Sequence, residues 1–194
     1  MTTLDYPGEL AAVIFCQGCP WRCRYCHNSE LIPREAETRI PWSQIIEFLQ
    51  QRRGLLDAVV FSGGEPTLQK ALPAALKEIR SNGFKVGLHT GGPYPARLEQ
   101  ILPLVDWVGL DIKAQEDNYA QVTGVENSGK KAWKSAKLLI ESGIPHEIRT
   151  TVHPELLSTA EQHLITQRLS QLGPTQHRFQ ACVAEHCLDP ALRV

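Results

Sequence analysis

FCQGCPWRCRYCHN (residues 15–28) places four cysteines within eleven positions and follows the last of them directly with a histidine. These residues are Cys16, Cys19, Cys23, Cys26 and His27. Thiols this closely spaced can hold a zinc ion or an iron–sulfur cluster, or can pair in a disulfide. Each use implies a different kind of protein, so the surrounding sequence has to distinguish them.

The composition is that of an ordinary globular protein. Its 194 residues suit one domain with a sizeable core, so we expect residues 1–194 to form a single domain. With 20 basic and 21 acidic residues the net charge is −1, which favours neither nucleic acid nor an anionic membrane as a partner. The N-terminus lacks the basic start and apolar stretch of a signal peptide. We therefore expect a cytoplasmic protein, whose clustered thiols are reduced and available as metal ligands.

Six short apolar runs alternate with segments of helical spacing. The runs are rich in β-branched or aromatic residues, as buried strands are. They are Ala11–Phe15, Ala58–Phe61, Lys85–His89, Trp107–Ile112, His146–Val152 and Arg178–Val183. Between them, apolar residues recur at i, i+3, i+4 and i+7 over Trp42–Leu49 and Leu72–Ile79. Strands separated by helices predict an α/β protein with a parallel sheet.

Several short motifs mark where helices begin and end. Asn82-Gly83 and Ser142-Gly143 are typical of helix C-termini, and Pro95 of a helix start. Ser158–Glu161 has the form of a capping box. The periodicity does not say whether the sheet closes, half-closes or stays open. In each case, ligands bind at the carboxyl ends of parallel strands.

Residues capable of chemistry gather directly after the apolar runs. The cysteines follow the first run, Ser62–Pro66 the second and His89–Gly92 the third. The fourth run leads into Asp111–Lys113, and the fifth contains Arg149. We therefore predict an active site at the carboxyl edge of the sheet.

The spacing of the cysteines disfavours a structural zinc site. Zinc usually takes two pairs of ligands that lie a dozen or more residues apart, whereas only three residues separate Cys19 from Cys23. Cys182 and Cys187 could supply further ligands from a distance. Iron–sulfur clusters, in contrast, are held by closely spaced thiolates. Zinc is the weaker alternative.

The spacing Cys19-x₃-Cys23-x₂-Cys26 resembles the signature of the radical S-adenosylmethionine (AdoMet) enzymes. The resemblance implies that these cysteines hold a [4Fe–4S] cluster whose fourth iron is chelated by AdoMet, and that Tyr25 lies beside the adenine. It implies reductive cleavage of AdoMet to a 5′-deoxyadenosyl radical that takes a hydrogen atom from a substrate. The implied fold is a partial (β/α)₆ barrel of six mostly parallel strands with outer helices, in agreement with the six runs.

The stretch after the second run is similar to the GGEP motif of the same family. It comprises Gly63, Gly64, Glu65 and Pro66. The resemblance implies that this motif pairs with the AdoMet amino group. Glycines permit a close backbone approach, and Glu65 offers a carboxylate to the ammonium. Alone such a turn is a weak signal, but here it follows the second strand behind the cysteine motif.

Three further stretches resemble the activating enzymes of glycyl-radical enzymes. They are Leu4–Gly8, Gln17–Cys19 and Tyr25–Asn28. The group includes the activases of pyruvate formate-lyase and of anaerobic ribonucleotide reductase, and the second of these is the better match. The resemblance implies a protein substrate that loses a hydrogen from a glycine Cα. It also implies a flavodoxin or ferredoxin as the electron donor.

The same resemblance implies cofactor contacts for His27, Asp111, Lys113 and Arg149. Arg149 could meet the AdoMet carboxylate. Other interpretations stay open: Asp111 as a strand-end turn residue, Lys113 as a solvated surface lysine and Arg149 as a cross-strand ion-pair partner. His89 stands where such activases often have an aspartate, which puts a monovalent-cation site in doubt.

The remaining cysteines are expected to have no chemical role. We expect Cys16 to be a bystander near the cluster. We expect Cys182 and Cys187 to be inert, although with His186 they could form a second metal site or a redox pair. The rival functions are a radical AdoMet enzyme for a small molecule, resembling the deazapurine synthases, and a non-catalytic electron carrier or zinc module.

Overall fold

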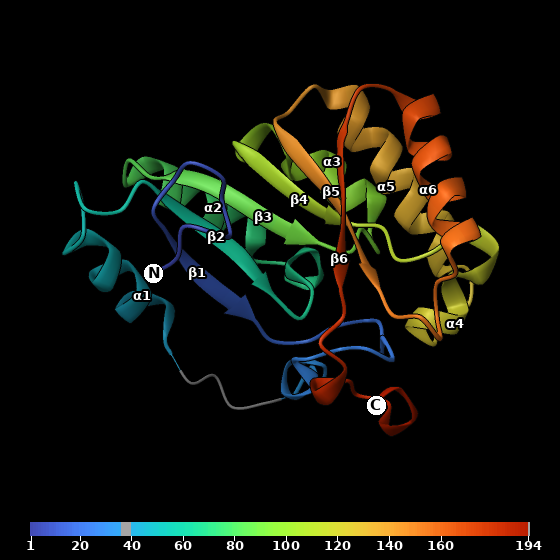
Figure 1. Ribbon diagram of the computed structural model, residues 1–194. Coiled ribbons are helices and arrows are strands. Elements are labelled where there is room, and N and C mark those ends of the chain that lie inside the picture. Colours follow the sequence, from blue (N-terminus) through green and yellow to red (C-terminus); the bar gives the residue numbers. More distant parts are fainter. Residues whose placement is uncertain (36–39, 194) are drawn as a thin grey trace.

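The computed structural model describes residues 1–35 and 40–193 and contains one six-stranded parallel sheet in the order β1-β2-β3-β4-β5-β6 (Figure 1). The strands are β1 (Ala11–Cys16), β2 (Ala58–Gly63), β3 (Lys85–Thr90), β4 (Trp107–Asp111), β5 (His146–Val152) and β6 (Gln176–Ala181). Each predicted run forms a strand, and the predicted fold class is confirmed. Only β6 is displaced along the chain, beginning at Gln176 in place of Arg178.

Helices connect successive strands. They are α1 (Trp42–Gln50), α2 (Leu72–Ser81), α3 (Pro95–Ile101), α4 (Tyr119–Thr123), α5 (Ser128–Ser142) and α6 (Thr159–Leu172). The 3₁₀ turns are η1 (Ser29–Leu31), η2 (Pro66–Leu68), η3 (Leu102–Leu104), η4 (Glu116–Asn118), η5 (Ala184–His186) and η6 (Pro190–Leu192). In the part of the chain that the structure describes, no helix is long and apolar enough to cross a bilayer.

The predicted helix ends are confirmed. The helix α3 begins at Pro95, and α5 ends before Gly143, whose φ of +70° is the left-handed conformation that glycine adopts readily. Ser158 Oγ accepts a hydrogen bond from Glu161 N, and the Glu161 carboxylate accepts one from Ser158 N, which completes the capping box of α6.

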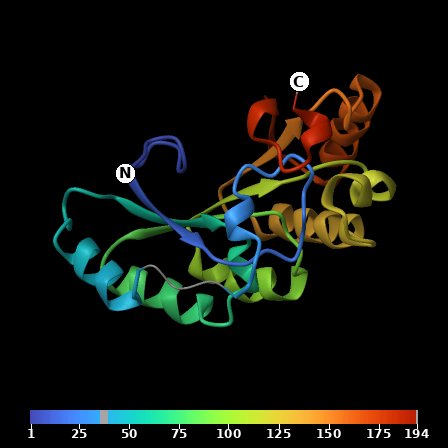
Figure 2. The same ribbon diagram turned by 90° about the horizontal axis from the view of Figure 1, so that it is seen from below.

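The two faces of the sheet have different cores. The helix-covered face carries the large core, to which Val59, Val86 and Val108 contribute. The opposite face is crossed by the N-terminal segment, where the Tyr6 ring stacks on Trp107 at 5.4 Å between centroids (Figure 2). This small second core lies at the amino ends of the strands, so the carboxyl ends are left for a binding site.

The sheet stays open. In the described residues, β1 pairs only with β2 and β6 only with β5, so the two edge strands do not meet. After β6, the chain returns toward the loop that follows β1, so the two segments lie side by side (Figures 1 and 2). The described elements therefore form the predicted partial barrel, with its opening between β1 and β6. That residues 1–194 form a single domain stays a prediction.

Candidate active site

The cysteine loop (residues 17–28) leaves β1 at its carboxyl end and is held by backbone hydrogen bonds on two sides. Cys19 N donates to Ile32 O at 3.0 Å, which folds the chain after the loop back against it. Arg24 N donates to Val122 O in α4 at 2.9 Å. These bonds fix the path of the loop between the chain that follows it and α4.

Gly63, the last residue of β2, packs against the end of β1, and Gly64 packs against the cysteine loop. A Cβ on Gly63 would lie 2.5 Å from Cys16 N, and a Cβ on Gly64 would lie 2.4 Å from Gly18 O. Glu65 N donates to the same Gly18 oxygen at 2.9 Å. The two glycines therefore approach protein backbone closely, Gly63 that of β1 and Gly64 that of the cysteine loop. The contact with AdoMet predicted for these glycines stays a prediction.

The Glu65 carboxylate is buried and bonded within the protein. Its oxygens accept hydrogen bonds from Thr67 N at 3.0 Å, Thr67 Oγ1 at 2.5 Å, Thr90 Oγ1 at 2.7 Å and Gly91 N at 3.0 Å. Burial raises the pKa of Glu65, and these hydrogen bonds act in the opposite direction. Glu65 thus ties the end of β2 to the end of β3. The sequence motif contains no sign of this internal role.

Three charged side chains form a chain of ion pairs beside the end of β4, with Arg149 contributed from the middle of β5. Asp111 Oδ1 lies 3.2 Å from Arg149 Nε, and Asp111 Oδ2 lies 3.5 Å from Lys113 Nζ. Burial raises the pKa of Asp111, but Lys113 and Arg149 outweigh it and hold that pKa below its usual value. Lys113 is not a solvated surface lysine, because its side chain is only 11% exposed.

Lys113 also links this network to the cysteine loop. Its Nζ lies 5.6 Å from the centre of the Tyr25 ring, a cation–π arrangement. Burial lowers the pKa of Lys113, but Tyr25, Asp111 and Cys23 together hold it well above its ordinary value. Lys113 therefore stays a cation beside the aromatic residue of the motif.

Tyr119 is a site residue that the sequence did not predict. Its side chain is fully buried, and its hydroxyl accepts a hydrogen bond from Lys113 N at 3.0 Å and donates one to Asp111 O at 3.3 Å. It fixes the backbone that carries both charges. A lone tyrosine at the start of a short helix carries no signal that would identify it.

The three predicted cluster ligands share one environment. Burial raises the pKa of Cys19 to about 12 and of Cys23 to about 11. Cys23 raises the pKa of Cys19, and Cys26 raises the pKa of Cys23, whereas Lys113 lowers both pKa values. Burial also raises the pKa of Cys16 to about 12, but there the neighbouring charge is Glu65 and no other cysteine contributes.

The donor set and one unpaired hydroxyl fit a [4Fe–4S] cluster and AdoMet. Tyr25 is 7% exposed, and among the described residues its buried Oη has no hydrogen-bond partner. A buried hydroxyl without a partner is costly, so a polar ligand is expected beside it. Within the described ranges, Cys19, Cys23 and Cys26 do not bring their three sulfurs within 4.8 Å of one another. Three thiols closely spaced in the sequence are the donors that an iron–sulfur cluster takes.

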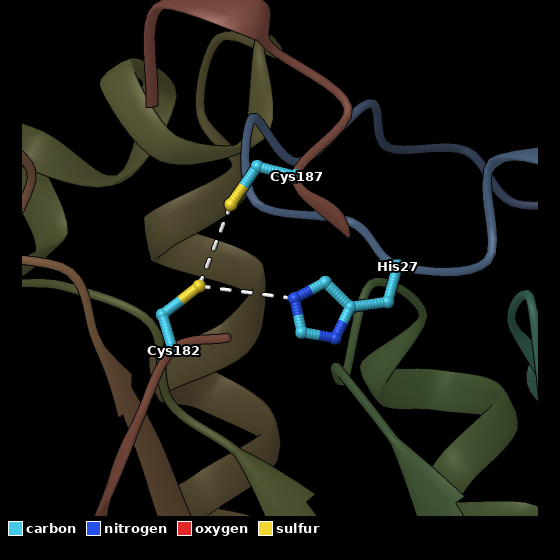
Figure 3. A group of neighbouring side chains, drawn as sticks. All are labelled: His27, Cys182 and Cys187. Carbon is cyan, nitrogen blue, oxygen red and sulfur yellow. Dashed lines mark hydrogen bonds between the residues drawn. The ribbon is translucent and has the colours of Figure 1, made fainter. Parts of the chain in front are cut away.

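Two of the positions singled out in the sequence have their hydrogen-bond partners outside this network. His27 is exposed, and its Nε2 lies 3.8 Å from the sulfur of Cys182, beyond the end of β6 (Figure 3). His89 lies on the face crossed by the N-terminal segment, where its Nε2 is 2.8 Å from Asp5 O. Burial, and then Arg149, lower the pKa of His89. His27 therefore lies with Cys182 and Cys187 and not with the other residues predicted to contact the cofactor.

Comparison with known proteins agrees with this geometry. Residues 13–164 match the family described as the Radical SAM superfamily. A protein of Methanocaldococcus jannaschii named "Putative glycyl-radical enzyme activating enzyme" is 34% identical over 167 residues, which cover 81% of this chain and 67% of that protein. A pyruvate formate-lyase-activating enzyme of Clostridium pasteurianum is 32% identical over 168 residues, covering 83% and 69%.

Solved structures share the fold at lower sequence identity. Streptococcus suis SuiB, bound to its precursor peptide SuiA, superposes with a TM-score of 0.72 at 18% identity. The match covers 95% of this chain but 42% of SuiB. It therefore extends the agreement in fold to nearly all of this chain.

Proposed function

Since the chain belongs to the radical SAM superfamily, we propose that it is an activating enzyme that creates a glycyl radical on a partner protein. The names of the relatives support this substrate class. When bound, a [4Fe–4S] cluster with one open iron supplies the electron that cleaves AdoMet to methionine and a 5′-deoxyadenosyl radical. The residues of this chain bind and orient the reactants.

The observation that carries the proposal is the meeting of three thiols with the Asp111 ion-pair network at one edge of the sheet. In the proposed site, Cys19, Cys23 and Cys26 hold the cluster. AdoMet carries an ammonium and a carboxylate on its methionine part. The Asp111 carboxylate suits the ammonium, and Arg149 suits the carboxylate by charge-assisted hydrogen bonds. No side chain is required as a general acid or base.

The open side of the sheet supports a protein substrate. A glycine Cα inside another protein reaches the site only if a loop of that protein enters beside the cofactor. The edge strands β1 and β6 do not pair in the described chain, and Phe15 at the end of β1 is 57% exposed. We propose that the partner loop enters here. Anaerobic ribonucleotide reductase and pyruvate formate-lyase types are the candidate partners.

The proposed setting is the cytoplasm, and the proposed electron donor is a flavodoxin or a ferredoxin. All six cysteines are free thiols in the structure. Reduced thiols are the rule in the cytoplasm, and a one-electron protein donor is required to reduce the cluster.

The test begins with protein reconstituted anaerobically with iron and sulfide. We expect about four irons per chain. We also expect 5′-deoxyadenosine to form when the protein is reduced in the presence of AdoMet. Electron paramagnetic resonance on a mixture with a candidate glycyl-radical enzyme should then show a glycyl doublet. The Cys23→Ser variant is the matched control and should yield neither product.

Two outcomes would contradict the proposal. If deoxyadenosine forms but no glycyl-radical enzyme of the same cell acquires a radical, the small-molecule alternative is favoured. A protein that binds zinc through Cys19, Cys23 and Cys26 and releases no deoxyadenosine would favour a non-catalytic module.

A further inference from the structure

Three metal-ligating side chains meet outside the proposed active site. His27, Cys182 and Cys187 bring one ligand atom each within 4.8 Å of one another, and no other such group occurs in the described part of the chain (Figure 3). His27 belongs to the cysteine loop, whereas the two cysteines belong to the tail (residues 182–193) that follows β6. His27 and Cys182 are 155 residues apart in the sequence, so the fold, and not local sequence, brings them together.

The distances within the group are those of ligands that share one ion. The sulfurs of Cys182 and Cys187 are 3.5 Å apart, and His27 Nε2 lies 3.8 Å from the Cys182 sulfur. Tetrahedral zinc with ordinary bond lengths places two thiolates about 3.8 Å apart and a thiolate and an imidazole nitrogen about 3.6 Å apart. These two distances match zinc geometry to within a few tenths of an ångström, and the third pair, His27 Nε2 and the Cys187 sulfur, lies within 4.8 Å.

The chemistry of the donors points to the same metal. Two thiolates and an imidazole are soft and borderline ligands, which zinc binds well. Calcium and magnesium take oxygen ligands instead. A disulfide is the other use of two neighbouring cysteines. A bond of about 2.05 Å would be required for it, and it would leave unexplained why a histidine nitrogen lies against one of the two sulfurs.

We propose that His27, Cys182 and Cys187 bind one Zn²⁺ ion, with water as the fourth ligand. The exposure of His27 leaves room for that water. The thiols bind as thiolates, so their protons pass to solvent as the ion enters. This site shares no ligand with the proposed iron–sulfur cluster and does not depend on the function proposed above.

The zinc ion would fasten the tail to the cysteine loop. The tail is already placed there: Asp189 N donates to Arg24 O at 2.8 Å, and Arg24 Nε lies 2.6 Å from Asp189 Oδ2. An exposed ion pair adds little stability, because solvent screens it. A metal that binds both segments holds them more firmly. The ion thus clips together two segments next to the opening between β1 and β6.

Metal analysis of the anaerobically reconstituted protein, after incubation with Zn²⁺ and gel filtration, tests the site. We expect about one zinc per chain beside about four irons. Cys182→Ser should lose the zinc and keep the irons. The Cys19/Cys23/Cys26→Ser variant should lose the irons and keep the zinc. The exposed His163→Gln variant is the matched control and should keep both metals.

Hydrogen exchange gives a second measurement on unmutated protein. Removing zinc with a chelator should speed amide exchange in residues 182–193, and restoring zinc should reverse the change. The site is disproved if zinc does not exceed the level of Cys182→Ser, or if zinc disappears together with the iron in the triple variant. A disulfide between Cys182 and Cys187 in protein kept anaerobic and treated with zinc would likewise overturn it.

Discussion

Asp111 and Arg149 are register partners on β4 and β5, and the Asp111 Oδ1 lies 3.2 Å from Arg149 Nε. The carboxylate therefore joins two neighbouring strands at the edge where the cysteine loop lies. Lys113 Nζ lies 3.5 Å from the other carboxylate oxygen of Asp111, Oδ2, so this one anion lies between two cations. The arrangement accounts for the lowered pKa of Asp111 in spite of burial.

Acid should weaken the folded protein through Asp111. Its pKa is lower in the folded state than in the unfolded chain, so its contribution to stability is present above about pH 4 and is lost as pH falls through the folded pKa. In Asp111→Asn this contribution is absent at every pH. Urea unfolding should show a difference between wild type and variant that shrinks below about pH 4. A difference that does not change with pH would contradict this role.

Replacing Lys113 should weaken AdoMet binding without loss of the cluster. Lys113 lies over the Tyr25 ring and contacts Asp111, but it supplies no metal ligand. We expect Lys113→Met to lower AdoMet affinity about tenfold to a hundredfold, as for loss of a charged hydrogen bond. Equilibrium dialysis against labelled AdoMet, with iron content measured in parallel, checks this. The exposed Lys130→Met should bind AdoMet as the wild type does.

Gly64→Ala should displace the cysteine loop. The added Cβ would lie 2.4 Å from Gly18 O, a backbone atom, so the backbone of the loop has to shift. We expect iron content after reconstitution to fall to less than about half of the four irons. Gly143→Ala is the control, since its Cβ would meet nothing within 4 Å. It should cost about 1 kcal/mol through its positive φ and leave the iron unchanged.

Cys16→Ser should retain about four irons per chain, whereas Cys23→Ser should not. The Cys16 thiol lies at the end of β1 and is not among the groups that shift the pKa of Cys19 or of Cys23. Iron and sulfide analysis of the two variants, reconstituted side by side, makes the comparison. A Cys16→Ser protein that fails to hold four irons would show that Cys16 is a ligand.

The sequence alone predicted the six strands, the ends of the helices and the cysteine motif, because these depend on residues close together in the chain. Apolar runs identify β2, β3 and β4 well, because most residues of those strands are buried. The edge strand β6 is mostly exposed and has no continuous apolar run, and here the predicted bounds were displaced.

Only the tertiary structure brought His27 to Cys182 and Cys187, turned Glu65 toward Thr90, and set Lys113 over Tyr25. Each of these contacts depends on where a parallel sheet returns the chain. Periodicity records which face of an element is buried, but not which distant residue will lie against it. The sequence therefore determined the fold and the cluster motif, while the partners of each side chain were decided by the packing of strand ends.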